Sequence, residues 1–365
     1  MRARIILFVL LLLPGIAAAA DLRYPQIPPL PKAPRDPDNA PTPARRNLGA
    51  ELFFDLRLST SGKTSCANCH VHNTSWQDNL VKPRPDTSQG GEFFTLAFNT
   101  DSLLNIVHRQ FFFRDGRTQD LSHAFTEPWI EENQRLGTTR PAAATALAGI
   151  LRGLPGYVQR FRRAFDVDIT AIPDEEVFDL AGDALAVFAR QLVTRTSPFD
   201  RWNQGRGEIS DAAARGVELF TGKGRCIACH NGPNFTDQEF HNISSSPPDA
   251  NGVRADEGRA KVTGLAADGG RFLTPTLRQV TTTSPYFHDG GPGTILDVLN
   301  HFDAGAAADP NHDPAVGTPL GLTPAEKYDI YQFIKTLRSP VSKVRGPTGF
   351  LCDDAAVARL RAKLP

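Results

Sequence analysis

Two copies of one short motif constrain this 365-residue chain more than any other feature of its sequence. Residues 66–70 read Cys-Ala-Asn-Cys-His, and residues 226–230 read Cys-Ile-Ala-Cys-His. This spacing is typical of covalent haem attachment, because two thiols on one helical turn can bond the two vinyl groups of a porphyrin. The histidine that follows each pair then faces the iron as its proximal ligand. We therefore predict two covalently bound haem c groups, held by Cys66, Cys69 and His70 and by Cys226, Cys229 and His230.

Two other uses of paired cysteines fit the motif less well. A zinc site would gather all four cysteines in one cluster, and such a cluster does not require a histidine after each pair. A redox-active dithiol is expected between a strand and a helix, and that context is absent around both motifs. Cys352 is left over, and we interpret it as a free thiol or an intermolecular partner because no further pairing site remains.

The N-terminus reads as a secretory signal peptide over residues 1–20. Arginines near the start precede an apolar run from Ile5 to Leu13, and small residues then lead to a predicted cleavage near Ala20. The apolar run is shorter than the roughly 20 residues that a membrane helix needs, and no later stretch reaches that length. We expect an exported, periplasmic protein with no membrane span.

Helical periodicity predicts an all-α fold of two cytochrome c-like haem domains with few short strands. Helices are expected over residues 43–54, 174–194, 211–219 and 323–337, three of them preceded by a capping residue or opened by a proline. The length fits two domains, and duplication of one haem-binding domain would explain the repeated motif. The predicted order after the signal peptide is a proline-rich arm (21–43), an N-terminal haem domain (44–200), a C-terminal haem domain (205–345) and a tail (346–365).

The charge balance argues against a nucleic-acid-binding role. The chain has 40 lysines and arginines against 40 aspartates and glutamates, so it carries no net basic field to hold a phosphate backbone. Overall neutrality also gives no indication of an acidic or basic docking patch, because such patches depend on arrangement in space.

Several blocks beside the two motifs resemble the di-haem cytochrome c peroxidases and the related MauG proteins of bacteria. They are residues 48–59, 99–105, 113–117, 197–201, 274–278 and 284–290. The resemblance covers nearly all of the mature chain. It implies that hydrogen peroxide reacts at the N-terminal haem, while the C-terminal haem stores or relays an electron.

The resemblance also implies a calcium ion between the two haems. Its ligands would be the side chain of Asn99 and the main-chain carbonyls of Thr283 and Pro285. These are hard oxygen donors, which calcium prefers. The alternative interpretation of Asn99 is a turn residue whose side chain bonds its own backbone.

The C-terminal haem departs from the family pattern. The typical peroxidase places methionine opposite the histidine of this haem, but the only methionine of this chain is Met1, which is lost with the signal peptide. MauG has tyrosine there, and alignment places Phe302 at this position, which has no atom to donate to iron. Either this haem is five-coordinate or another side chain reaches it, and the candidates are His301 first, then His288, His241 and Tyr286. A histidine here is otherwise a polar core residue with a hydrogen-bond partner.

The predicted peroxide-binding side of the N-terminal haem also departs from the family pattern. The distal proline and acidic residue of the family fall on Pro128 and Gln134. A glutamate can move a proton between the two peroxide oxygens, and an amide cannot. Glu131 and Glu132 lie close enough to substitute, unless they are solvated surface carboxylates. No histidine occurs between residues 73 and 99, where peroxidases of this family carry a ligand that leaves on activation, so we expect an N-terminal haem that is open without reduction.

A third departure concerns electron flow between the haems. The family usually has a tryptophan at the position of Arg114, and a guanidinium cannot carry a hole. Arg114 could instead pair with a haem propionate, because its fork matches a carboxylate. The three tryptophans of this chain, Trp76, Trp129 and Trp202, are more often core or rim aromatics than relays, although Trp129 follows the distal proline.

These features favour an oxidoreductase that reacts with hydrogen peroxide and draws electrons from a small periplasmic donor, a cytochrome c or a cupredoxin. The absent methionine favours a MauG-like alternative, which oxidises a residue of a partner protein. Gln134 and Arg114 favour a third hypothesis, a di-haem electron carrier or redox sensor that is not an enzyme. Fold analogy informs function weakly once site residues differ, so the residues around each haem must decide.

Overall fold

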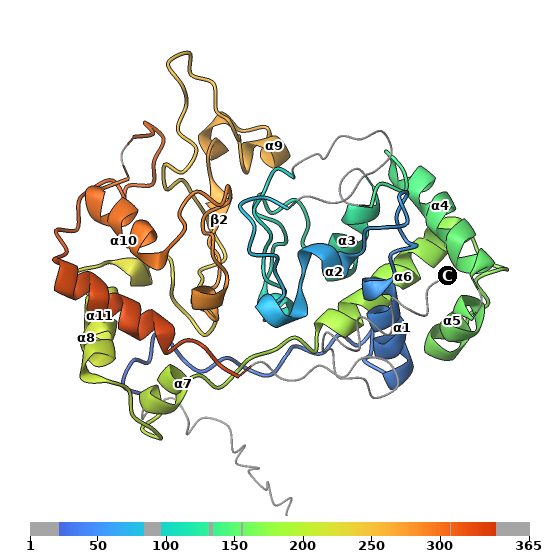
Figure 1. The fold of residues 1–365 in the computed structure, drawn as a ribbon, viewed down its shortest axis with the longest axis horizontal. Coiled ribbons are helices and arrows are strands. Elements are labelled where there is room, and N and C mark those ends of the chain that lie inside the picture. The colour runs from blue at the N-terminus through green and yellow to red at the C-terminus, as the bar shows by residue number, and fades with distance from the viewer. Residues whose placement is uncertain (1–21, 84–95, 131–133, 155, 307, 341–365) are drawn as a thin grey trace, which may run out of the picture.

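The computed structural model describes residues 22–340, apart from 84–95, 131–133, 155 and 307. The predicted signal peptide, the predicted tail and Cys352 lie outside the described residues. Within them the chain is mostly helical and has two short strands, which confirms the predicted all-α class. Figure 1 shows two lobes side by side, joined by extended segments along one edge. None of the described helices is both long and apolar enough to cross a membrane.

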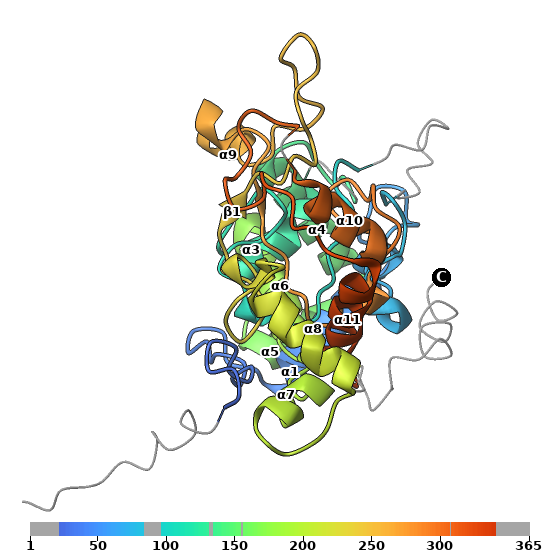
Figure 2. The same cartoon turned by 90° about the vertical axis from the view of Figure 1, so that its left-hand side faces the viewer.

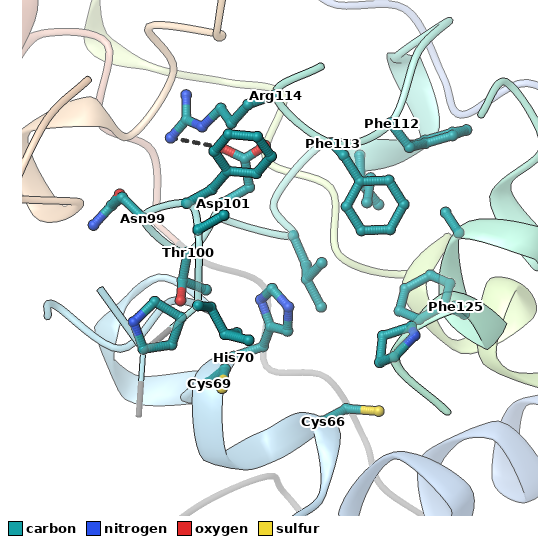
Figure 3. Close-up of a pocket in the computed structure, with 18 of the residues that line it drawn as sticks. Cys66, Cys69, His70, Asn99, Thr100, Asp101, Phe112, Phe113, Arg114 and Phe125 are labelled. Carbon is teal, nitrogen blue, oxygen red and sulfur yellow. Dashed lines mark ion pairs between the residues drawn. The ribbon is translucent and has the colours of Figure 1, made fainter. Parts of the chain in front are cut away.

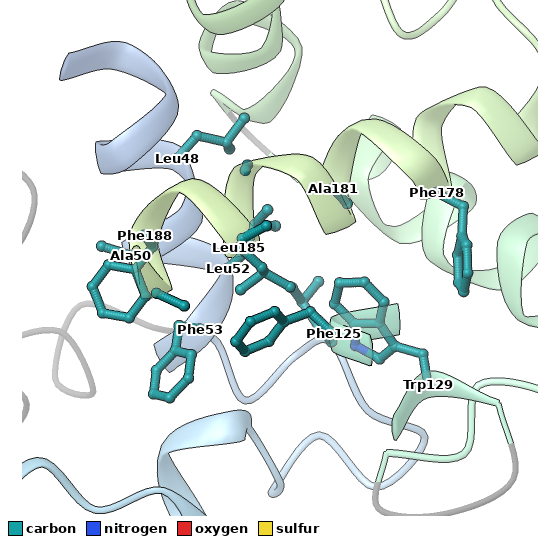
Figure 4. Close-up of a cluster of buried hydrophobic side chains, with 14 of the residues drawn as sticks. Leu48, Ala50, Leu52, Phe53, Phe125, Trp129, Phe178, Ala181, Leu185 and Phe188 are labelled. Atoms are coloured by element: carbon teal, nitrogen blue, oxygen red, sulfur yellow. The ribbon is translucent and has the colours of Figure 1, made fainter. Parts of the chain in front are cut away.

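The first lobe packs its helices around the 16-residue helix α6, which contacts α1, α3 and α4. Figure 4 shows the resulting core, where Leu52 and Phe53 of α1 meet Leu185 and Phe188 of α6. Burying each such side chain stabilises the fold by about 1.5–3 kcal/mol. The helices of this lobe are α1 (Pro43–Phe54), α2 (Cys66–Cys69), α3 (Leu121–Thr126), α4 (Arg140–Gly153), α5 (Tyr157–Phe165) and α6 (Asp174–Ala189).

The second lobe has a smaller core of aromatic rings packed edge to face. Phe333 lies 5.3 Å from Phe199 and 5.1 Å from Phe220, measured between ring centroids. The helices of this lobe are α7 (Pro198–Asn203), α8 (Asp211–Thr221), α9 (Ala260–Thr263), α10 (Ile295–Ala304) and α11 (Pro324–Lys335). Its two strands are antiparallel, β1 (Phe240–His241) and β2 (Phe272–Leu273).

Short 3-10 turns connect these elements in both lobes. Two of them carry site residues, because η3 contains Pro128 and η4 contains Cys226. The six described turns are η1 (His72–Thr74), η2 (Ile106–His108), η3 (Glu127–Trp129), η4 (Cys226–Ala228), η5 (Ala266–Asp268) and η6 (Val280–Thr282).

The predicted helices form, and three begin at a hydroxyl cap. The side chains of Thr42, Ser210 and Thr323 accept hydrogen bonds from the first turns of α1, α8 and α11. The helix predicted over 174–194 ends five residues early, at Ala189. Asn105 explains the difference, because its backbone N–H bonds the Leu192 carbonyl and its side chain accepts from the Thr194 N–H, both at 2.7 Å.

One helix pair in each lobe crosses at a glycine. A methyl group at Gly49 of α1 would meet the Ala184 carbonyl oxygen at 1.9 Å, and one at Gly216 of α8 would meet that of Asp329 at 2.0 Å. Figures 1 and 2 both show α8 lying against α11. The two glycines open similar segments, Gly-Ala-Glu-Leu-Phe and Gly-Val-Glu-Leu-Phe, so the internal repeat extends upstream of the haem motifs.

The arm before α1 contacts both lobes. Ile27 is fully buried in the core of the second lobe, and its carbonyl accepts a hydrogen bond from the Asn203 side chain at 2.9 Å. Further along, the Asn39 side chain donates to the Asp183 carbonyl of α6 at 2.9 Å. The exact domain bounds stay a prediction, and the arm contributes to packing in both lobes.

Candidate haem sites and the wall between them

The first cysteine pair lies on the single turn α2, which follows α1. The Ser65 N–H donates to the Asn68 side chain at 3.0 Å, and the His70 N–H donates to the Cys66 carbonyl at 2.9 Å. These bonds hold the turn so that Cys66, Cys69 and His70 line one cavity, with both thiols free. Figure 3 shows the three residues together at one side of this N-terminal cavity.

The imidazole of His70 is held in the tautomer that an iron ligand needs. Its Nδ1 lies 3.1 Å from the carbonyl oxygen of Trp76. A carbonyl can only accept, so Nδ1 carries the proton and the lone pair of Nε2 is left for a metal. Burial also lowers the pKa of His70, which keeps the ring neutral.

The second motif repeats this geometry with a different local structure. Cys226 begins the 3-10 turn η4, and the His230 N–H donates to the Cys226 carbonyl at 2.9 Å. The His230 Nδ1 lies 3.0 Å from the Phe235 carbonyl oxygen, and burial lowers the pKa of His230 as it does for His70. Two thiols, one neutral histidine and an adjoining cavity therefore recur in each lobe, and they fit a covalently bound haem.

The cysteines do not form the single cluster that zinc would need. Cys66 and Cys69 line the N-terminal cavity, whereas Cys226 and Cys229 line a separate C-terminal cavity. Among the described residues, the one grouping of histidine, cysteine and acidic side chains close enough to share a metal ion contains a single cysteine, Cys229.

The N-terminal cavity has about 1050 Å³ of empty space and is lined mainly by apolar side chains. Pro128 and Gln134, to which the family resemblance gives distal positions, both line it. Gln134 is 2% exposed, and its Nε2 donates to the Leu58 carbonyl at 3.1 Å while its Oε1 lies 4.0 Å from the Cys66 sulfur. His70 is the only histidine among the described residues that line this cavity. Glu131 and Glu132 lie outside the described residues.

The C-terminal cavity has about 1620 Å³ of empty space and is lined by three of the four candidates for a second iron ligand. His241 uses both ring nitrogens elsewhere, at 2.6 Å from Asp313 and 2.9 Å from Asp237. His288 stacks on Phe272 with ring centroids 3.8 Å apart.

The remaining candidates differ in their access to this cavity. Tyr286 lines it and donates its hydroxyl to the Val280 carbonyl at 3.2 Å. His301 is not among the described lining residues, and its Nε2 lies 2.7 Å from the Ile243 carbonyl oxygen. Its neighbour Phe302 does line the cavity.

One wall is shared by the two cavities. The described residues that line both are Asn99, Thr100, Asp101, Arg109 and Arg114. The Asn99 side chain donates its Nδ2 to the Leu80 carbonyl at 2.7 Å, which leaves its oxygen for another partner. The other two predicted calcium ligands, Thr283 and Pro285, line the C-terminal cavity with it.

Comparison with known proteins agrees with this two-site arrangement. The family model described as di-haem cytochrome c peroxidase matches residues 43–208. The methylamine utilization protein MauG of Methylorubrum extorquens is 34% identical over 91% of this chain and 87% of its own length. The chain belongs to the di-haem cytochrome c peroxidase and MauG family. It is therefore a peroxidase-type oxidoreductase with two c-type haems.

One further relative agrees with this membership, and two solved structures share the fold. The cytochrome c551 peroxidase of Nitrosomonas europaea is 35% identical over 72% of this chain and 74% of its own length. The fold matches that of a MauG-like protein associated with microbial copper homeostasis, with a TM-score of 0.74 and 24% identity over 87% of this chain and 98% of the other. The di-haem peroxidase BthA of Burkholderia thailandensis shares the fold with a TM-score of 0.67, covering 86% of this chain and 96% of its own.

Arg114 stands where the family resemblance implies a tryptophan, and the structure shows how the arginine is accommodated. Arg114 Nη2 lies 2.7 Å from one oxygen of Asp101, and Arg109 Nη1 lies 2.8 Å from the other. Trp76 and Trp129 are buried in the first core, while Trp202 stacks on Tyr24 with ring centroids 5.9 Å apart.

Sequence reasoning missed two groups of site residues. It gave no role to Asp101 and Arg109, although Asp101 lies inside one of the blocks that carry the family resemblance. It considered His241 only as an iron ligand and overlooked Asp237, whose carboxylate lies 2.9 Å from the His241 Nε2. Because this segment is not helical, their spacing in the sequence gave no signal of the contact.

Proposed function

We propose that the protein acts in the periplasm and reacts with hydrogen peroxide at the N-terminal haem, with the C-terminal haem relaying electrons. The observation that carries this proposal is the lining of the N-terminal cavity. His70 is the only histidine among its described lining residues, and Pro128 and Gln134 lie on the same cavity. Cys66, Cys69 and His70 would hold the haem, and no second histidine among the described lining residues would compete with peroxide.

The residues of this cavity act on peroxide by binding and orienting it. When bound, the haems supply the two electrons that, with two protons, convert hydrogen peroxide into two water molecules. The apolar rings of Phe112, Phe113 and Phe125 limit access of water, which strengthens every polar interaction in the cavity. Gln134 can hydrogen-bond a peroxide oxygen but cannot exchange a proton with it. Proton transfer then falls to water, and we expect slow turnover.

A MauG-like role remains the second candidate, and one observation favours it. Phe302 lines the C-terminal cavity at the position where the typical peroxidase has methionine, and it offers no ligand atom. A C-terminal haem without methionine has a lower potential, because methionine ligation raises it. Such a haem more readily holds an oxidising equivalent that a residue of a partner protein could receive.

We include one calcium ion in the proposal. Asn99, Thr283 and Pro285 all line the C-terminal cavity, and each offers an oxygen atom, two of them from the main chain. The ion would tie the shared wall to the loop that precedes α10. Adding a chelator to the purified holoprotein, with thermal unfolding as the readout, tests for the ion independently of activity.

The test of function is stoichiometric hydrogen peroxide added to the purified diferric protein and to its half-reduced form. Soret and near-infrared absorption, with electron paramagnetic resonance on frozen samples, report the reaction and the spin state of each haem. Rapid change in the diferric protein supports the open N-terminal site and directs the search to a partner protein. Reaction only after half-reduction supports a peroxidase that draws electrons from a small cytochrome c or cupredoxin. If neither form reacts, both enzyme hypotheses are overturned, and the protein is then an electron carrier or a redox sensor.

A further inference from the structure

The shared wall contains a compact cluster of three charged side chains. The two carboxylate oxygens of Asp101 form separate ion pairs, one with Arg109 at 2.8 Å and the other with Arg114 at 2.7 Å. The side chains of Arg109, Arg114 and Asp101 are only 8%, 13% and 20% exposed. We call these three residues the Arg-Asp-Arg bridge.

The bridge lies where the two haem sites come closest to sharing residues. All three members line the N-terminal cavity with His70 and the C-terminal cavity with His230. Figure 3 shows Arg114 and Asp101 on the Asn99 side of the N-terminal cavity, opposite Phe112 and Phe125. A charge held here acts on both sites through a medium of low dielectric constant, where it is screened little.

The bridge is not neutral within itself. Two guanidinium groups share one carboxylate, so one positive charge is left uncompensated inside the cluster. Moreover, the Nε–H of Arg114 is buried and has no hydrogen-bond partner among the described residues. A buried donor of this kind calls for an acceptor, and a carboxylate is the acceptor that best matches a guanidinium.

We propose that Arg114 is a positioning residue that binds a haem carboxylate through its free Nε–H, while Asp101 and Arg109 fix its guanidinium. This inference rests on the proposed function only in needing both haems to be bound. The bridge then keeps a fixed positive charge between the two sites. Because reduction adds a negative charge to a haem, the bridge raises the reduction potential of the haems beside it.

The test is redox titration of the purified holoprotein followed by haem absorption, with resonance Raman spectra of the haem carboxylate bending modes. We expect Arg114→Met to lower the reduction equilibrium constant of at least one haem about tenfold, which is 59 mV for one electron, and to shift a bending mode. Arg114→Lys should keep most of the potential but still shift the mode, because it retains the charge without the Nε donor. Asp101→Asn should move the potential in the opposite direction.

A matched control removes the same kind of charge from a residue that lines neither cavity. Arg215 pairs with Asp329 at 2.8 Å, and its side chain is 58% exposed, so Arg215→Met should leave both potentials unchanged. The proposal is overturned if Arg114→Met keeps both potentials within twofold and leaves the bending modes in place. It is also overturned if the Arg114→Met and Asp101→Asn shifts have the same sign, since local disturbance would then explain both.

This titration uses no peroxide. A protein that shows the expected shifts but does not react with peroxide would support the bridge while refuting the proposed function.

Discussion

The N-terminal and C-terminal cavities share the way they would hold a haem and differ in what faces it. Each has two cysteine thiols and a histidine whose Nδ1 meets a main-chain carbonyl within 3.1 Å. In the rest of their linings the two cavities differ, because the N-terminal cavity presents Pro128 and Gln134, whereas the C-terminal cavity presents His241, His288 and Phe302. Attachment is thus a local property of a five-residue segment, while reactivity depends on distant segments that each lobe folds against it.

The largest expected effect separates the two sites by removing one haem at a time. Cys66→Ala with Cys69→Ala should halve the haem content and abolish the peroxide-induced Soret change, because the open site is lost. Cys226→Ala with Cys229→Ala should also halve the haem content but keep a peroxide response at the N-terminal site. Haem assay and stopped-flow absorption measure both, and equal loss of response in the two variants would contradict different roles for the cavities.

The next effect concerns the missing acid–base group. Gln134→Glu should increase the rate of peroxide reaction about 100-fold, because positioned acid–base catalysis contributes at least that factor. Gln134→Met is the matched control, similar in size but without a hydrogen bond, and it should not accelerate the reaction. Stopped-flow absorption over a range of pH would give the rates of both variants. Equal rates would show that the side chain at position 134 takes no part in the peroxide reaction.

A smaller effect compares the helix crossings of the two lobes. Gly49→Ala and Gly216→Ala should each destabilise their lobe by about 1–3 kcal/mol, because the added methyl meets a backbone oxygen that cannot move aside. Gly149→Ala in α4 is the control, since a methyl there meets nothing within 4 Å and alanine favours a helix. Denaturant unfolding of the holoproteins gives the three values. Similar stability of all three variants would show that the helices move apart at the two glycines at little cost in free energy.

The smallest effect is a pH dependence confined to the C-terminal lobe. Hydrogen bonds, first to Asp237, then to the Cys229 sulfur and to Asp313, raise the pKa of His241 to about 11 from an unfolded value near 6.5. The charged ring therefore stabilises the fold fully below pH 6.5, and this contribution declines as the pH rises toward 11. His241→Gln should flatten unfolding free energy measured between pH 7 and 10. A parent and variant with parallel profiles would refute this role.

Much of the fold was predictable because its signals are local. Capping residues, helical periodicity and the spacing of two cysteines and a histidine act within a few residues, so the helices and haem motifs could be read directly. Asn105 ended one helix early through bonds to Leu192 and Thr194, which are distant in sequence.

The residues that face the haems were harder to predict, because their direction depends on the surrounding fold. His301 and Phe302 are neighbours in α10, but successive helical residues point about 100° apart. His301 therefore bonds Ile243 while Phe302 lines the cavity. The Arg-Asp-Arg bridge shows the same limit, since nothing in the sequence near Asp101 indicates that two arginines converge on it.

The arm that begins the described chain gives the molecule an unusual order of assembly. Ile27 lies near the start of the chain, yet it is buried in a core whose other members include Phe333 and Leu337. That core can close only after α11 is available, while the first lobe, which lies between Ile27 and α11 in the sequence, can pack earlier. Segments from near both ends of the described chain therefore meet in the second lobe, and a single cut between Ile27 and α1 would break the link between the arm and the first lobe.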